Sequence, residues 1–219
     1  MKLAVELAGE EVWLLAEKAM FWPRRQTLLI ADAHFGKAAA YRKLGQPVPT
    51  GTTQTNIDVL NRLMKRYPCT EVIFLGDFLH APESHALNTL AAIRTWREAH
   101  SEVTMTLIRG NHDRRAGDPP DALKIEVIAE PLLLGPFALQ HEPDPHETHH
   151  VLAGHVHPTY RLRGKGRQSV RAPCFCLGTK VSVLPAFGAF TGGMNISPAP
   201  GTRLYLVADE GVWPLTQTD

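Results

Sequence analysis

The chain is 219 residues long, which at roughly 150 residues per domain predicts a single domain spanning residues 1–219. Its 23 Lys and Arg residues and 22 Asp and Glu residues give a formal net charge of +1. A balance so close to zero excludes a strongly basic nucleic-acid-binding tail and an acidic, solvating protein. Eleven histidines are many for this length, and because imidazole is a common metal ligand they direct attention to metal chemistry.

Cysteine usage and hydropathy predict a soluble, cytoplasmic protein. The three cysteines, Cys69, Cys174 and Cys176, are too few for a disulfide framework, and their odd number fits a reducing compartment. We interpret Cys174 and Cys176, which are two positions apart, as small buried core residues. Glu6 interrupts the start of the chain before an apolar signal sequence can develop. The longest charge-free run, residues 181–202, is repeatedly broken by Gly and Pro, so we expect a loop there and no membrane span.

Short apolar stretches open the chain, and longer continuous apolar runs follow. We expect strands at residues 3–7, 12–15, 19–22, 27–31, 71–75 and 103–108. The last three are continuous runs, which are typical of strands buried on both faces of a sheet. Helices are predicted at residues 38–44, 52–67 and 84–100. The third of these has an apolar stripe at helical spacing, made of Leu87, Leu90, Ile93 and Trp96.

The second half of the chain is predicted to be mostly strand. We expect strands at residues 137–140, 151–153, 159–162, 169–171, 175–177, 204–208 and 211–213. A first half that alternates strand and helix, followed by a strand-rich half, predicts an α/β fold in which two sheets lie face to face with helices outside. Polar residues follow the buried strands, and this edge is where open α/β sheets bind ligands.

Four polar clusters and one further histidine directly follow predicted strands. They are Asp32-Ala33-His34, Gly76-Asp77, Gly110-Asn111-His112-Asp113, Gly154-His155-Val156-His157, and His141. A single helix cannot hold groups that lie tens of residues apart, but neighbouring strands of a sheet can. Carboxylate, imidazole and amide oxygen together suit Mn, Fe or Zn better than Ca or Mg. So many donors predict two metal ions about 3.5–4 Å apart, bridged by a carboxylate.

Each cluster alone also has a purely structural interpretation. Gly76-Asp77 is typical of a turn after a strand, Asp32 and His34 of a capped turn, and the Gly110 cluster of a tight turn with a helix cap. The four clusters, however, occur in one chain, in order and each at a strand end. That combination favours the metal site.

The series D-x-H, G-D, G-N-H-D and G-H-x-H, from Asp32 to His157, resembles the calcineurin-like metallophosphoesterase superfamily. Longer stretches resemble one branch of it, the bacterial ligase-associated DNA-damage-response endonucleases. These stretches are residues 31–37, 45–51, 76–81, 110–117, 141–143 and 184–193. The resemblance implies a four-layer αββα sandwich in which two mixed β-sheets are flanked by helices.

The resemblance also implies a role for each residue of the clusters. Metal one is expected on Asp32, His34 and His157, metal two on Asn111, His141 and His155, and Asp77 as the bridge between them. His112 is expected to face the substrate as a general acid, with Asp113 orienting its ring through a ring N–H. The nucleophile is expected to be a hydroxide that bridges the ions, because dications lower the pKa of bound water.

Basic residues gather in two places close to these clusters. Arg161, Arg163, Lys165, Arg167 and Arg171 surround a predicted hairpin turn, and Arg109, Arg114 and Arg115 flank His112. We expect Arg109, Arg114, Arg163 and Lys165 to bind substrate phosphates. The alternative for the hairpin is a solvated edge whose charge protects the sheet from aggregation.

Two further groups of histidines lie outside the expected ligand set. For His80, which follows the Gly76-Asp77 pair, contact with the metal site and a plain surface loop remain alternatives. His146, His149 and His150 are interpreted as part of a solvated connection rather than as a metal site.

Residues and resemblance together predict a two-metal phosphodiesterase, with Mn²⁺ as the expected ion, that acts as a DNA endonuclease in repair. DNA is the expected substrate, and repair proteins such as a ligase or a helicase are the expected partners. One alternative is a phosphodiesterase or pyrophosphatase that acts on nucleotides. Another is a non-catalytic scaffold with the same fold, which the presence of all seven expected ligands and His112 disfavours.

Overall fold

The computed structural model describes residues 1–164, 166 and 168–215, and in this part of the chain the strands form two sheets. The strands of the first sheet lie in chain order: β1 (Lys2–Leu7), β2 (Glu10–Leu15), β3 (Met20–Trp22), β4 (Thr27–Ile30), β5 (Glu71–Leu75), β6 (Thr104–Ile108) and β7 (Glu126–Ile128). Strands β4 to β7 are parallel to one another. Their carboxyl ends are aligned, because Ile30 pairs with Phe74 and Leu75 with Ile108.

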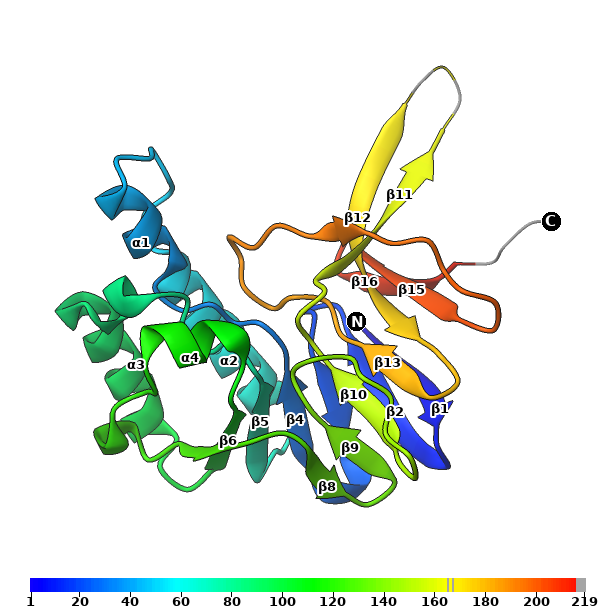
Figure 1. The fold of residues 1–219 in the computed structure, drawn as a ribbon, viewed down its shortest axis with the longest axis horizontal. Helices are drawn as coiled ribbons and strands as arrows, with labels where there is room; N and C mark the ends of the chain where they lie inside the picture. The colour runs from blue at the N-terminus through cyan, green and yellow to red at the C-terminus, as the bar shows by residue number, and fades with distance from the viewer. Residues whose placement is uncertain (165, 167, 216–219) are drawn as a thin grey trace.

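The second sheet is also mixed and contains the rest of the described strands. They are β8 (Leu132–Leu134), β9 (Phe137–Leu139), β10 (His150–Ala153), β11 (Pro158–Arg163), β12 (Ser169–Leu177), β13 (Val181–Val183), β14 (Met194–Asn195), β15 (Arg203–Ala208) and β16 (Gly211–Pro214). Their order is β14-β11-β12-β13-β10-β9-β8, with β15 paired to β12 and β16. The β11–β12 hairpin extends away from the body of the molecule (Figure 1).

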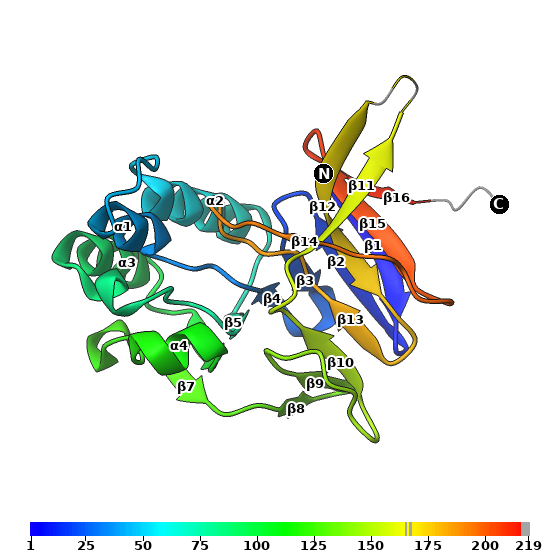
Figure 2. The ribbon, with the colours of Figure 1, turned by 45° about the horizontal axis from the view of Figure 1, so that its top comes forward.

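The α-helices of the described residues lie on one side of the molecule, against the first sheet (Figures 1 and 2). They are α1 (Lys37–Lys43), α2 (Thr52–Arg66), α3 (Leu87–Ala99) and α4 (Asn111–Ala116). Short 3-10 turns form at Pro23–Arg25, Pro82–His85 and Asp121–Leu123. None of the described helices has the length and apolar content needed to cross a bilayer.

Apolar side chains fill two layers, one on each face of the first sheet. Leu28 and Phe74 pack with the apolar faces of α2 and α3, whereas Leu29 and Ile73 pack against the second sheet, including Phe137. Neighbouring residues of one strand therefore face opposite layers. Burying each such side chain contributes about 1.5–3 kcal/mol. The central strands are thus fixed from both sides, and so are the loops that leave their carboxyl ends.

The expected α/β sandwich of two mixed sheets is confirmed, with its helical cover on one side. No α-helix forms in the described residues after Ala116, so the outer face of the second sheet carries none. The turn expected after Gly110 continues into a short helix, α4. Leu87 is 86% exposed instead of joining the α3 stripe, because it is the first residue of that helix.

Some strands differ from the expectation because they are too short to leave a pattern. β7, β8, β13 and β14 have two or three residues each, and the sequence did not indicate them. The two strands expected at residues 169–171 and 175–177 are one continuous strand, β12. Pro173 lies between them, at a position where β12 pairs with β11 alone, because its pairing with β15 begins at Cys174.

Candidate metal centre

The carboxyl ends of five strands, taken from both sheets, meet and carry all the expected ligands. The ligands are Asp32 and His34 after β4, Asp77 after β5, Asn111 after β6, His141 after β9, and His155 and His157 after β10. The loops are joined by backbone hydrogen bonds. The N–H of His34 donates to the carbonyl of Asp77 over 2.8 Å, and the N–H of Gly154 donates to the carbonyl of His141 over 3.1 Å.

One group of donor atoms comes from Asp32, His34, Asp77 and His157, whose ligand atoms all lie within 4.8 Å of one another. His34 Nε2 is 3.3 Å from His157 Nε2 and 3.7 Å from Asp77 Oδ2. His157 Nε2 is 3.5 Å from Asp32 Oδ1. Atoms that bind one ion at about 2.0–2.2 Å are themselves about 3.0–3.5 Å apart. This group therefore has the spacing of a metal-ligand set.

A second group has the same spacing and shares Asp77 with the first. Asn111 Oδ1 lies 2.9 Å from His141 Nε2 and 3.0 Å from His155 Nδ1. The two imidazole nitrogens are 3.0 Å apart, and His141 Nε2 is 3.5 Å from Asp77 Oδ1. The two oxygens of Asp77 thus face different groups, as a bridging carboxylate requires.

Protonation and burial in both groups suit divalent cations. Burial lowers the pKa of His34 well below its usual value, so its imidazole is neutral, the form that binds metal. His141 Nδ1 donates to the Leu75 carbonyl over 3.1 Å, which leaves Nε2 as the ligand atom. Burial also raises the pKa of Asp77, because removal from water disfavours the charged carboxylate. The donor set therefore fits two divalent ions.

Five of the seven ligands sit on left-handed backbone, which side chains other than Gly rarely adopt. Their φ angles are 52° for Asp32, 47° for His34, 51° for Asp77, 66° for His155 and 49° for His157. Each such residue costs on the order of 1–3 kcal/mol and persists only where the surrounding structure enforces it. The hydrogen bonds between the loops and the two packed layers provide that enforcement here.

The glycines of the motifs make room for the ligands. A Cβ on Gly76 would overlap the ring of His141, and one on Gly110 would overlap the carboxylate of Asp77. A Cβ on Gly154 would lie 2.7 Å from Asp32 Oδ2. Each Gly therefore leaves space for a ligand from a different loop, which explains why it precedes Asp77, Asn111 and His155 in the sequence.

His112 lies next to both ligand groups, and its side chain is not one of the expected ligands. Its backbone N–H donates to Asp77 Oδ1 over 2.8 Å, and its ring centroid lies 4.9 Å from that of His34. Ring Nδ1 is 2.7 Å from the carbonyl oxygen of His80, which can only accept, so Nδ1 carries the hydrogen. Nε2 is left for another partner.

The expectation that Asp113 orients the ring of His112 is wrong. Its carboxylate accepts the N–H of Leu79 over 2.9 Å and the N–H of Gly110 over 3.0 Å. Asp113 is fully buried, and burial raises its pKa to about 6. It joins the loops after β5 and β6, and its effect on His112 is through the backbone. The sequence could not show this, because the residue that holds the ring, His80, offers only its carbonyl.

His80 and Lys37 also border the site, and only the first was considered from the sequence. His80 Nδ1 is 3.3 Å from His34 Nδ1, and its ring stacks on that of His112 with centroids 4.6 Å apart. Burial and the charge of Lys37 lower the pKa of His80 to about 4. Contact with the metal site is therefore the correct alternative for His80. Lys37 could have been found as the last residue of the motif stretch 31–37.

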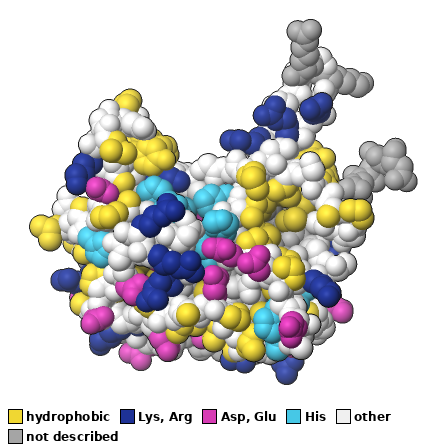
Figure 3. Space-filling model, in the orientation of Figure 1, with side chains coloured by type: hydrophobic (Ala, Val, Ile, Leu, Met, Phe, Trp, Pro, Cys, Tyr) yellow, Lys and Arg dark blue, Asp and Glu magenta, His cyan; other side chains and the backbone are white. Residues whose placement is uncertain are grey.

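The arginines expected to bind substrate differ in whether they already pair with a carboxylate. Arg109 makes two hydrogen bonds to Asp118, at 2.8 and 2.6 Å, and Arg114 lies 3.3 Å from Glu130. These partners compete with a phosphate for both side chains. Arg163 is exposed on β11, on the hairpin that borders the hollow over the histidines in Figure 3. Lys165 lies outside the described residues.

The loop with His146 and His149 is held by hydrogen bonds between its own residues. His146 Nδ1 accepts the backbone N–H groups of Thr148 and His149, at 3.3 and 3.2 Å. His150 belongs to β10 and contacts Ser182 Oγ over 2.8 Å. Among the described residues these histidines form no metal-binding group.

The crystal structure of Pseudomonas putida nuclease MPE is 50% identical to this chain and superposes with a TM-score of 0.87, over 98% of this chain and 100% of that one. This chain belongs to the calcineurin-like metallophosphoesterase superfamily. The metallophosphoesterase also matches Yfce, a phosphoesterase from E. coli, at 16% identity and a TM-score of 0.43, over 85% of this chain and 95% of that one. Neither a family model nor a curated protein matches it. The 50% identity to nuclease MPE over nearly the whole of both chains, together with the ligand groups described above, identifies the chain as a metal-dependent phosphoesterase.

Proposed function

We propose that this metallophosphoesterase is a two-metal phosphodiesterase that cleaves DNA internally. The observation that carries the proposal is the pair of ligand groups that share Asp77, with the ring of His112 beside them. The similar protein from Pseudomonas putida is a nuclease, which supports nucleic acid as the substrate. Mn²⁺ is the ion we propose for both groups, because they mix carboxylate, imidazole and amide ligands; Fe or Zn would also suit them.

The ions, when bound, would neutralise the phosphoryl oxygens and supply a water of lowered pKa as nucleophile. Asp77 holds the two ligand groups in register, and its Oδ1 also fixes the backbone of His112. His112, anchored through Nδ1, presents Nε2 toward the substrate. As an imidazolium, with a hydrogen on both ring nitrogens, it would give the Nε2 proton to the leaving oxygen and return to the neutral Nδ1–H form. A deoxyribose alkoxide is a poor leaving group, so cleavage of DNA requires this proton. Esters with a good leaving group do not require it.

We propose that the substrate binds in the hollow over the metal centre. Figure 3 shows histidines at its floor, with α1 on one side and the basic β11–β12 hairpin on the other. Arg163 of the hairpin would contact phosphates, with Arg109 and Arg114 contributing after exchange of their carboxylate partners. We further propose, from the resemblance of the motifs, that the enzyme acts in cytoplasmic DNA repair beside a ligase or a helicase.

The test is cleavage by metal-free protein reconstituted with Mn²⁺, Zn²⁺ or Fe²⁺. Circular single-stranded and double-stranded DNA, a chromogenic diester, a chromogenic monoester and a nucleoside diphosphate would be compared. We expect Mn²⁺ to support cleavage of circular DNA and of the diester. Asp77→Ala should abolish both reactions and the binding of metal, whereas Asp58→Ala, an exposed acid of α2, should change neither.

Two results would contradict the proposal. If Asp77→Ala still cleaved DNA, the assignment of the two metal groups would be wrong. If only the nucleoside diphosphate were hydrolysed, the enzyme would be a nucleotide pyrophosphatase with the same centre.

A further inference from the structure

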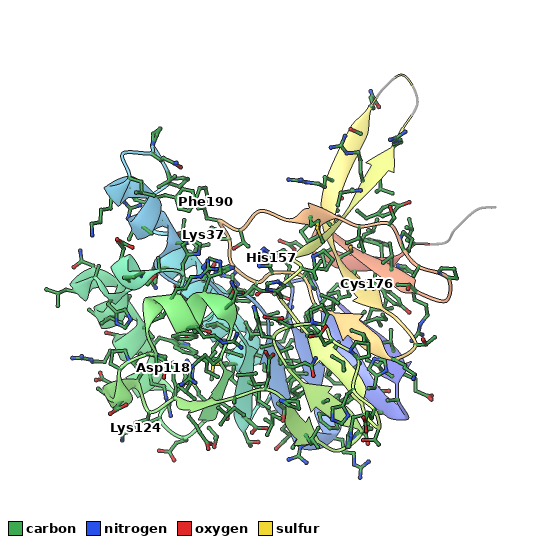
Figure 4. All side chains as sticks on the ribbon, in the orientation of Figure 1. Lys37, Asp118, Lys124, His157, Cys176 and Phe190 are labelled. Carbon is green, nitrogen blue, oxygen red and sulfur yellow. The ribbon has the colours of Figure 1, made fainter. Side chains whose placement is uncertain are left out.

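A pocket of about 300 Å³ opens beside the metal centre, between α1 and the loop that follows β13. Its lining residues are Lys37, Tyr41, Ala189, Phe190, Thr191 and Gly192. In Figure 4, Lys37 and Phe190, which line the same pocket, lie close together and near the labelled His157. The pocket therefore lies where the substrate next to a reacting phosphate would pass.

Aromatic rings lead from the metal ligands into this pocket. Tyr41 and Phe190 are 5.9 Å apart at ring centroids and perpendicular to each other. The ring of Tyr41 is also 5.9 Å from that of His80, which in turn lies 3.3 Å from His34 between Nδ1 atoms. Only His80 separates Tyr41 from a metal ligand. Both Tyr41 and Phe190 keep part of their surface exposed, so a flat group can still reach them.

Lys37 adds a positive charge to the same wall. It is four residues before Tyr41 on α1, so both side chains lie on one face of the helix. Its ammonium has no ion-pair or hydrogen-bond partner among the described residues, although it is half-buried. The charges of Asp77 and Asp32 act on it, which shows that it lies near the metal-binding carboxylates. If metal ions neutralised those carboxylates, the Lys37 ammonium would need another anion as its partner.

We propose that this pocket binds the nucleotide next to the scissile phosphate, with the base on Tyr41 and Phe190 and a phosphate oxygen on Lys37. The proposal rests on the proposed function. An aromatic surface beside a cation is the combination that holds an unpaired base and its backbone, since every base has a face that can stack. A base inside a duplex is covered on both faces, so the pocket requires a base that has left the stack.

The test is a double-mutant-type cycle, in which the aromatic ring is removed from the enzyme, the base is removed from the substrate, or both are removed. The substrates are two short single-stranded DNA oligonucleotides, one intact and one with a single abasic sugar, and incision is measured at the bonds that flank this position. We expect the wild type to cut next to the intact base about tenfold faster than next to the abasic sugar. Tyr41→Ala should cut the intact strand about tenfold more slowly than the wild type does, and its rate on the abasic strand should change little. Tyr41→Phe should behave as the wild type.

Lys37→Met should give a different pattern, because its partner is a phosphate that both strands retain. We expect an equal slowing of both substrates, with a weaker dependence on salt. Leu44→Ala and Lys43→Met are the matched controls, since both are exposed residues near the end of α1 that do not line the pocket. Neither should change the ratio between the two strands.

The outcomes separate this proposal from the one on which it rests. If Tyr41→Ala slowed both strands equally, or the wild type cut both at the same rate, the base would not lie on Tyr41. If Lys37→Met acted only on the intact strand, the phosphate assignment would be wrong. If the wild type incised no oligonucleotide but hydrolysed the chromogenic diester, the failure would be that of the proposed DNA substrate.

Discussion

The metal centre and the rim above it are built in opposite ways. At the centre, buried side chains such as Asp32 and His34 follow strand ends on left-handed backbone, and glycines leave space for the ligand side chains. At the rim, Arg163 is exposed on an extending hairpin, and Arg109 and Arg114 are held by carboxylates. The centre is fixed by the fold, while the rim depends on which partner each side chain finds. Changes at the centre should therefore act on turnover, and changes at the rim on the choice of substrate.

The largest effect is expected at His112. His112→Ala should reduce turnover on DNA by about 10²–10⁴, because it removes the proton donor to the leaving oxygen. Metal content, measured by elemental analysis, should stay that of the wild type. His100→Ala, at the end of α3, is the control and should be fully active. Loss of metal in the His112 variant would show that this residue is a ligand instead.

The next effect tests whether a glycine sets the geometry of the centre. In Gly76→Ala the new Cβ would displace the ring of His141, and a shift of that size costs about 100-fold in rate. Gly45→Ala is a matched control, since Gly45 has φ 77° against 78° for Gly76 but nothing within 4 Å of the added Cβ. Both variants carry the same backbone strain, so equal activities would show that the contact with His141 is unimportant.

A smaller effect is expected at the rim. The double variant Arg161→Gln with Arg163→Gln should weaken cleavage of DNA several-fold and lower its salt dependence by about 0.7 in log–log slope for each phosphate that these side chains no longer neutralise. Hydrolysis of a small chromogenic diester should not change. The control is Arg62→Gln with Arg94→Gln, on the exposed faces of α2 and α3. Equal losses on both substrates would place the hairpin arginines in the chemistry rather than in binding.

The smallest effect concerns stability and Asp113. Its pKa is raised from 3.8 to about 6 by burial, so the folded state holds the proton more tightly than the unfolded state. Stability from this group is complete below pH about 4 and is lost as the pH rises to about 6. Urea unfolding of metal-free protein at both pH values should show this loss in the wild type. Asp113→Asn, which does not titrate, should lack that component.

The parts of the fold and site that the sequence predicted are those governed by local rules. Continuous apolar runs predicted β4, β5 and β6, and the polar residues directly after these strands are among those that meet at the candidate metal centre. The orientation of His112 could not be predicted, because it depends on a backbone carbonyl of His80 that carries no sequence signal. The same holds for Tyr41, which reaches the site only through the way α1 packs. Long-range contacts of this kind arise from tertiary structure, not from spacing.

Both ligand groups combine residues from the two halves of the chain, and His34 and His157 are 123 positions apart. Each ion would therefore bind only when the two sheets are docked at this edge, so metal affinity and the docking of the sheets are thermodynamically linked. Scarcity of metal would then have two consequences at once, loss of catalysis and a looser sandwich that proteases attack more readily. Cellular abundance of this enzyme should follow the supply of its metal.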